Sequence, residues 1–181
     1  MKDYLLLFLI SLLPVVLSAV VYLIEHTKAA EKVSNAVRQI IIGLLFGGLA
    51  IVGTEYGIKI DGAVINARDA SPVCAGLLFG APAGIIAGVI GGVERWIAVY
   101  WGAGEYTRLA CSISTVLAGV FAAVLRRHVF DNKKPKWYYC LATAAIMEVV
   151  HMLMIFLTNM TDAHKAFSFV RACSLPMIAV N

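Results

Sequence analysis

Charged side chains are scarce in this sequence. Only 14% of the 181 residues are charged, whereas 61% are hydrophobic and the mean hydropathy is +0.85. Soluble domains have about 25% charged residues, so the composition excludes an ordinary soluble enzyme or binding domain and indicates an integral membrane protein. A bilayer core about 30 Å thick needs roughly 20 apolar residues per helix, so the chain has room for five or six spans and short loops.

The sequence also has few of the residue patterns that mark chemical sites. Its four cysteines fall one each in separate apolar segments, without the spacing of a disulfide framework, a zinc site or a redox motif. A phosphate-binding glycine loop with its lysine, a nucleophile elbow and a histidine-rich cluster are all missing. We therefore expect no enzymatic activity, no cofactor and no metal in this chain. The formal charge of +4 comes from basic residues in loops, so we expect no nucleic-acid partner.

Apolar residues form six segments along the chain. Their approximate bounds are 4–24, 37–52, 73–93, 109–125, 137–157 and 166–181. We predict a single all-α polytopic membrane domain, a bundle of five or six transmembrane helices. The first segment is longer than the apolar core of a signal peptide, so we expect it to remain as an anchor. The last one stops within an apolar pattern that contains Pro176, which predicts a kink, and we expect the sequence to be the membrane part of a longer protein.

Basic residues predict the orientation of these segments. Loop 126–136 has the densest cluster of Lys and Arg, and Lys28, Lys32 and Arg38 lie around the first loop, so both loops are expected in the cytoplasm. Three apolar segments separate the two loops. If each of them crossed the membrane once, the loops would lie on opposite sides. One of the three therefore cannot be a simple span.

The glycine-rich third segment is the candidate for this exception. The sequence GAPAG at residues 80–84 interrupts it, and each half could reach only about 16 Å, which favours a broken or re-entrant hairpin. Such a hairpin places the N-terminus outside and brings Arg68 and Arg95 together near the outer face. However, glycines recur every four residues from Gly76 to Gly92, which is typical of one continuous, closely packed helix. Both interpretations stay open, and both place the C-terminus in the cytoplasm.

Arg68 and Arg95 flank this segment and are candidate anion-binding residues. An unpaired guanidinium group is costly near lipid, and its planar set of donors matches a carboxylate. The alternative is that each side chain extends to the headgroups or pairs locally, Arg68 with Asp69 and Arg95 with Glu94.

The fourth and fifth segments contain further polar candidates. Cys111, Ser114 and Thr115 lie within about one helical turn and could hold a small polar ligand, although such hydroxyls often bond only to backbone carbonyls or neighbouring helices. Glu148 and His151 share one face of the fifth segment. A di-iron site needs two such Glu-x-x-His motifs and further glutamates. We expect instead a structural or switching role, with an ion pair from Glu148 to Arg171 of the last segment.

Five separated motifs, in consistent order from about residue 35 to the end, resemble one family. The sequence resembles the membrane receptor region of LytS-type bacterial sensor kinases, the five-transmembrane LYT receptor. The motifs are Asn66-Ala67-Arg68, the glycine-rich run with Pro82 that ends in Arg95, CSISTVLAG, MEVVHML and the terminal LPMIAVN.

This resemblance implies a receptor in the bacterial plasma membrane, with a cytoplasmic C-terminus joined to a histidine kinase or a diguanylate cyclase. It implies a homodimer and a response regulator as partners. Some relatives sense pyruvate or similar small carboxylates, and others are linked to membrane potential and cell-wall lysis. The resemblance implies a ligand pocket at Arg68, Arg95, Cys111 and Ser114, and we include their neighbours Asn66 and Thr115 as candidates.

Three functions therefore compete at this point. The first is a receptor that binds a small anionic metabolite and signals to a cytoplasmic output domain. The second is a solute-binding component of an energy-coupling transporter, a class whose fold is more remotely similar. The third is a membrane-potential sensor without a ligand, in which Glu148, His151 and Arg171 respond to the potential.

Overall fold

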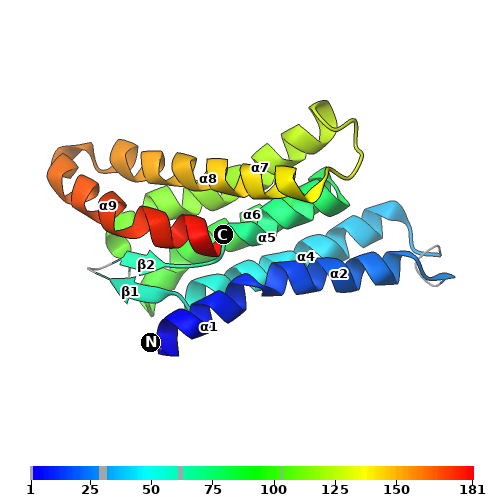
Figure 1. Ribbon diagram of the computed structural model, residues 1–181, viewed down its shortest axis with the longest axis horizontal. Helices are drawn as coiled ribbons and strands as arrows, with labels where there is room; N and C mark the ends of the chain where they lie inside the picture. Colours follow the sequence, from blue (N-terminus) through cyan, green and yellow to red (C-terminus); the bar gives the residue numbers. More distant parts are fainter. Residues whose placement is uncertain (1, 29–31, 61–62, 103) are drawn as a thin grey trace.

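The computed structural model describes residues 2–28, 32–60, 63–102 and 104–181, and this part of the chain is mostly α-helical (Figure 1). Among these residues, five helices are long and apolar enough to cross a membrane. They are Leu5–Glu25, Asn35–Glu55, Ala81–Tyr100, Glu105–His128 and Trp137–Thr158. The prediction of an all-α polytopic membrane domain is confirmed.

The first two spans form an antiparallel pair. Helix α1 (Lys2–Ser11) is followed after Leu12 by α2 (Leu13–Glu25), which has a proline in its first turn. Helix α4 (Asn35–Glu55) begins after Ser34, whose hydroxyl accepts a hydrogen bond from the backbone N–H of Val37. Serine at this position satisfies one of the free N–H groups of the first turn.

A short β-hairpin follows α4, and the apolar segments did not predict it. Strand β1 (Ile58–Ile60) pairs antiparallel with β2 (Ala63–Ile65), with Ile58 opposite Ile65. The hairpin lies at one end of the helical bundle (Figure 1). It leads into residues 66–69, which enter the bundle without regular secondary structure.

The glycine-rich segment is broken at Gly80. Helix α5 (Ala70–Cys74) continues as the π-helical turn η1 (Ala75–Phe79), and Gly80 then adopts a φ of 148° before α6 (Ala81–Ile97). The two halves pack against each other, since a Cβ on Gly84 would lie 2.5 Å from the Cα of Gly76. The interpretation as one continuous helix is therefore wrong, because the chain turns back at Gly80. The regularly spaced glycines instead let the two halves of this hairpin pack closely against each other.

The second half of the chain forms a helical bundle with α6. After the 3₁₀ turns η2 (Ala98–Tyr100) and η3 (Glu105–Thr107), helix α7 (Arg108–His128) packs along α6. Helix α8 (Trp137–Thr158) packs on α7, and the turn η4 (Met160–Asp162) leads into α9 (Ala163–Val180). Helix α9 contains Pro176 and returns along α8, so that the last residue lies near the middle of the molecule (Figure 1).

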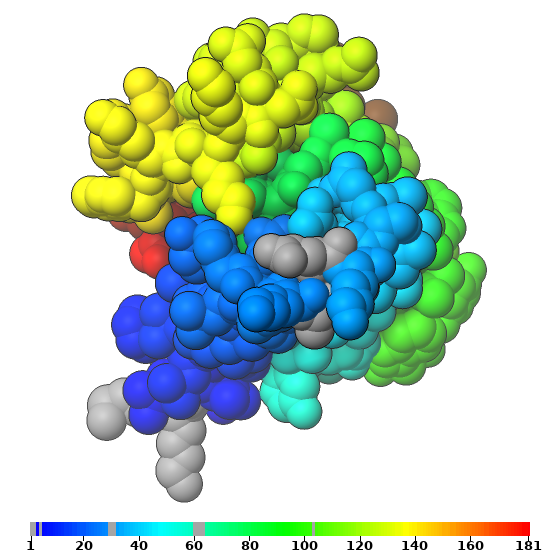
Figure 2. All heavy atoms as spheres, turned by 90° about the vertical axis from the view of Figure 1, so that its right-hand side faces the viewer, coloured from blue at the N-terminus to red at the C-terminus, as the bar shows by residue number. Residues whose placement is uncertain are grey.

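The two basic loops lie at the same end of the bundle. Glu25, at the end of α2, forms ion pairs with Lys134 at 3.1 Å and with Arg38 at 3.7 Å. Figure 2 shows this end, with the α7–α8 connection in yellow beside the blue ends of α2 and α4. Between the loops the chain runs through α4, residues 58–79, α6 and α7. The helical hairpin that turns at Gly80 thus adds one further crossing, so that the two basic loops are separated by an even number of crossings, as the charge pattern requires.

Candidate functional site

Residues 66–69 place three polar side chains inside the bundle. Asn66, Arg68 and Asp69 are all buried. The side chain of Asn66 accepts a hydrogen bond from the backbone N–H of Arg68 at 3.2 Å and donates one to the carbonyl of Val64 at 3.1 Å. This side-chain turn is typical of asparagine, and it fixes the backbone from which Arg68 projects.

Arg68 is fully buried, and every nitrogen of its guanidinium group has a hydrogen-bond partner. Its Nε donates to the hydroxyl of Thr115 at 2.6 Å and to Oδ1 of Asp69 at 3.3 Å. Its two terminal nitrogens donate to the hydroxyl of Thr54 at 3.3 Å and to the carbonyl of Cys111 at 3.4 Å. The hypothesis of local pairing with Asp69 is therefore confirmed for Arg68, and the charge of this arginine is balanced within the protein.

Asp69 connects Arg68 to helix α8. Its Oδ1 accepts from the hydroxyl of Thr115 at 2.6 Å, and its Oδ2 lies 3.0 Å from Nδ1 of His151. Burial raises the pKa of the Asp69 carboxyl, but the Arg68 guanidinium, His151 and the Thr115 hydroxyl together outweigh burial and hold this pKa well below its usual range. Asp69 is therefore an anion between two basic groups.

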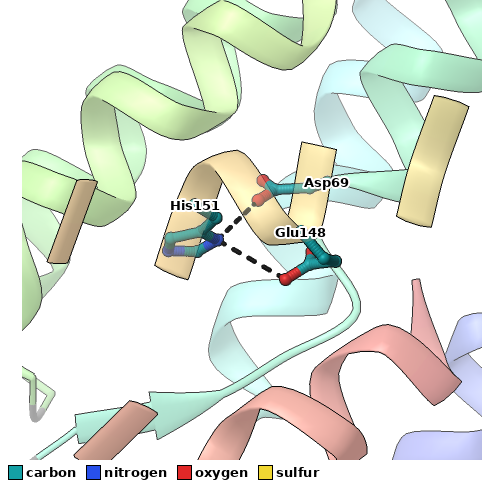
Figure 3. A group of neighbouring side chains, drawn as sticks. All are labelled: Asp69, Glu148 and His151. Atoms are coloured by element: carbon teal, nitrogen blue, oxygen red, sulfur yellow. Dashed lines mark ion pairs between the residues drawn. The ribbon is translucent and has the colours of Figure 1, made fainter. Parts of the chain in front are cut away.

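His151 also contacts Cys111 and Glu148. Its Nε2 lies 3.3 Å from the Cys111 thiol, and its Nδ1 lies 3.7 Å from Oε2 of Glu148 (Figure 3). Within the described part of the chain, neither oxygen of Glu148 has a hydrogen-bond partner. The expected ion pair between Glu148 and Arg171 does not form, because Glu148 is fully buried beside His151 whereas Arg171 is exposed.

Asp69, Glu148 and His151 could together hold a cation, since their ligand atoms all lie within 4.8 Å of one another. However, Oδ1 of Asp69 is already occupied by Arg68 and Thr115. The 3.0 Å between Nδ1 and Oδ2 is also shorter than the separation of about 3.3 Å between two ligands of tetrahedral zinc. We therefore interpret the cluster as an ion pair, and the absence of a metal stays a prediction.

Arg95 differs from Arg68 because most of its donors are free. It is also fully buried, but only one terminal nitrogen has a partner, the carbonyl of Gly104 at 2.6 Å. Its Nε and the other terminal nitrogen have no hydrogen-bond partner among the described residues, where no ion pair joins it to Glu94. Arg95 also interacts with the side chain of Cys111 and with the charge of Arg68, so it lies close to both residues.

A small cavity reaches Arg95 from the end of the bundle that carries the β-hairpin. Its volume is about 70 Å³, enough for a molecule of a few heavy atoms, since one water takes about 30 Å³ in the liquid. The residues that line it are Thr54, Glu55, Gly57, Lys59, Val64, Arg95, Ala98, Trp101 and Gly102. On α7, the hydroxyl of Ser114 is buried without a partner among the described residues.

Asn181 joins this site although the sequence did not identify it as a site residue. Its Oδ1 accepts hydrogen bonds from the backbone N–H groups of Asp69 at 2.9 Å and Ala70 at 3.1 Å. Its amide nitrogen donates to the carbonyl of Asn66 at 2.8 Å. The end of α9 is therefore bonded directly to the segment that carries Arg68. The terminal motif LPMIAVN contains this residue, but it did not indicate which residues Asn181 contacts.

The sequence matches a known family of membrane receptors. The sequence model of a family described as "5TMR of 5TMR-LYT" matches residues 21–181. The chain belongs to this family. It is 27% identical over 134 residues to the sensor histidine kinase YpdA of Escherichia coli K12, covering 74% of this chain and 23% of the kinase. No solved structure matches the chain.

Two further relatives are also sensors. The chain is 28% identical over 142 residues to the sensor histidine kinase BtsS of Escherichia coli K12, covering 76% of this chain and 24% of that protein. It is 27% identical over 146 residues to the sensor protein LytS of Bacillus cereus, covering 77% and 23%. The chain thus spans about a quarter of the length of these relatives. It is a multi-pass membrane sensor domain of the LytS type, as the motifs predicted.

Proposed function

We propose that this LytS-type domain binds a small carboxylate, such as pyruvate, and signals through α9 to a C-terminal cytoplasmic output domain, a histidine kinase or a diguanylate cyclase. One observation supports it most: Arg95 is fully buried with two nitrogens that lack partners in the described structure. A buried guanidinium without an anion is costly. A carboxylate would satisfy both nitrogens at once.

The two arginines have different roles in this proposal. Arg95 receives the carboxylate directly, at the inner end of a small cavity. Arg68 is already bonded to Asp69, Thr115, Thr54 and Cys111, so it shapes the site by holding these groups in place. The buried hydroxyl of Ser114 has no partner in the described part of the chain and is a further candidate donor, although it does not line the cavity at Arg95. The earlier hypothesis of an anion held equally by both arginines is thereby changed.

Signal output follows from the contact between Asn181 and residues 66–70. A ligand that changes the position of this segment also changes the end of α9. The ligand can shift the equilibrium between two conformational states of the receptor only by the difference in its affinity for them. A hundredfold difference corresponds to about 2.7 kcal/mol. The cytoplasmic C-terminus in a bacterial plasma membrane, the homodimer and the response regulator belong to this proposal.

The test is a titration of the purified protein in nanodiscs with a panel of small carboxylates, with thermal stability as the readout. A ligand that binds the folded state raises the melting temperature. We expect a saturable rise that is lost in Arg95→Ala and strongly reduced in Arg68→Ala. Arg108→Ala is the matched control, because Arg108 lies near the surface, stacked on Trp96.

The outcomes separate the competing functions. An unchanged affinity in Arg95→Ala would overturn the assignment of the site. No rise with any carboxylate would favour the potential sensor without a ligand, in which Asp69, Glu148 and His151 form the buried charged cluster. The relatives are sensors, so they favour a receptor over the transport component.

A further inference from the structure

A second cavity lies at the end of the bundle where the glycine-rich hairpin turns, the end that Figure 2 shows. Its volume is about 350 Å³, which is room for a phosphate group and several waters, since one water takes about 30 Å³ in the liquid. Its charged lining residues are Arg38 of α4 and Arg126 of α7, and no carboxylate lines it among the described residues. Arg95 lies near the other end of α6, roughly 20 Å away, so the two cavities are separate.

Arg126 contributes a buried guanidinium group to this cavity. The residue is only 8% exposed. One of its terminal nitrogens donates to the carbonyl of Leu77 in the turn η1. This is the only hydrogen bond of the guanidinium group within the described part of the chain, where no ion pair within 4.0 Å includes Arg126. Because a buried charge without a counterion is costly, the cavity favours an anion.

Basic groups outnumber acidic groups around this cavity. Oε1 of Glu25 lies 3.7 Å from Nε of Arg38, and Oε2 of the same carboxylate lies 3.1 Å from Nζ of Lys134. Glu25 is also the carboxylate that interacts with the charge of Arg126. Asp131 of the adjoining loop is exposed and forms no ion pair with a described residue. Three basic side chains thus share one carboxylate, so a net positive charge remains.

Uncharged groups complete the cavity and fix its shape. Gln39 of α4 is buried beside the turn, where its Nε2 donates to the carbonyl of Phe79 at 2.8 Å and its Oε1 accepts from the backbone N–H of Ala83 at 3.2 Å. Helix α6 begins directly after Gly80, so the positive end of its dipole lies at the cavity. Asn132, from the connection between α7 and α8, is exposed at the rim.

We propose that this cavity binds a phosphate group, held between Arg126 and Arg38 at the N-terminus of α6. The planar donors of arginine match two phosphate oxygens at once. The cavity lies at the end with the two basic loops, and basic pockets between transmembrane helices on the cytoplasmic side bind lipid headgroups. A soluble phosphate offers the same oxygens. Either one joins α4, the turn at Gly80 and α7, and this inference does not rest on the proposed carboxylate site.

The experiment titrates the full chain, in a nonionic detergent and a phosphate-free buffer, with phosphatidylglycerol and separately with inorganic phosphate. The readout is the melting temperature, which rises when a ligand binds the folded state. We expect a saturable rise with at least one probe and a Kd that increases more than about tenfold in Arg126→Gln. Arg127→Gln is the matched control: it removes the same charge from the next residue of α7, which is exposed and does not line the cavity.

Arg38→Gln is the second variant, because Arg126→Gln also removes the bond to Leu77 and so lowers the stability of the free protein. The side chain of Arg38 is partly exposed, and its loss should weaken binding without unfolding the chain. A rise with phosphatidylglycerol alone assigns the site to a lipid, and a rise with inorganic phosphate alone assigns it to a soluble phosphate. No rise with either probe, or equal losses of affinity in Arg127→Gln and the two cavity variants, would overturn the proposal.

Discussion

The side chain of Asn181 accepts a hydrogen bond from the backbone N–H of Asp69 at 2.9 Å. This bond joins the last turn of α9 to the residue that pairs with both Arg68 and His151. The two residues lie 112 positions apart in the chain. A change at the site therefore has a short, direct route to the end of α9.

Asn181→Ala tests this route. Asn181 satisfies backbone N–H groups at the start of α5 as a capping residue does, so its loss should cost about 1 kcal/mol of stability. Pyruvate affinity should also change, because the segment with Arg68 is no longer held. Thermal unfolding with and without pyruvate measures both effects. Asn159→Ala is the control, since Asn159 bonds only near the end of α8. Equal effects of the two variants on affinity would refute the route.

Removal of one charge from the buried pair of Arg68 and Asp69 should be strongly destabilising. Asp69→Asn leaves Arg68 without its counterion, and such changes typically cost about 3–5 kcal/mol. Arg68→Met should cost a similar amount, but the double variant should lose much less than the sum, because no uncompensated charge remains. Additive losses in a double-mutant cycle, measured by thermal unfolding, would show that the two groups do not interact.

The same carboxyl predicts a pH dependence of stability. The pKa of Asp69 is lowered in the folded state, so the unfolded chain binds its proton more readily as the pH falls. The stabilising contribution is complete above the unfolded value of about 4 and is lost progressively below it. The difference in melting temperature between wild type and Asp69→Asn should therefore shrink from pH 7 to pH 3. A constant difference would contradict the assignment.

Gly84→Ala should disrupt the hairpin of η1 and α6. Its new methyl group would lie 2.5 Å from the Cα of Gly76, and such overpacking costs about 1–3 kcal/mol. Gly48→Ala on α4 is the matched control, because nothing lies within 4 Å of a Cβ at that position. That change should stabilise the helix by up to about 1 kcal/mol. Melting temperatures that change in the same direction for both variants would exclude the close packing.

The shared end of the two basic loops can be checked by thiol labelling in cells. Lys28→Cys and Lys133→Cys, each in a background without native cysteines, should react with a membrane-impermeant reagent only after the membrane is opened. Glu105→Cys, at the other end of α7, should react in intact cells. All three positions are exposed. Labelling of Lys28→Cys and Lys133→Cys from opposite sides would disprove the topology, which predicts both loops in the cytoplasm.

The apolar segments alone predicted most of the helices. The predicted segment 137–157 corresponds to α8 (Trp137–Thr158), and 109–125 corresponds to α7 (Arg108–His128). A span needs about 20 apolar residues in a row, which is a local property that any window of the sequence reveals. The charge pattern also indicated that the glycine-rich segment was exceptional. Both basic loops are expected in the cytoplasm, so the chain must cross the membrane an even number of times between them, although three apolar segments lie there.

Tertiary structure alone decided which polar groups meet. Hydropathy could not choose between a hairpin and one helix, because glycines every four residues suit either; the backbone of Gly80 decided it. Hydropathy also could not show that Arg68 pairs with Asp69 whereas two nitrogens of Arg95 have no partner among the described residues, since both arginines lie beside an acidic residue in the sequence. The contacts of Asp69 with His151 and Asn181 join residues more than 80 positions apart. Such pairs depend on how helices pack, and local composition does not encode this.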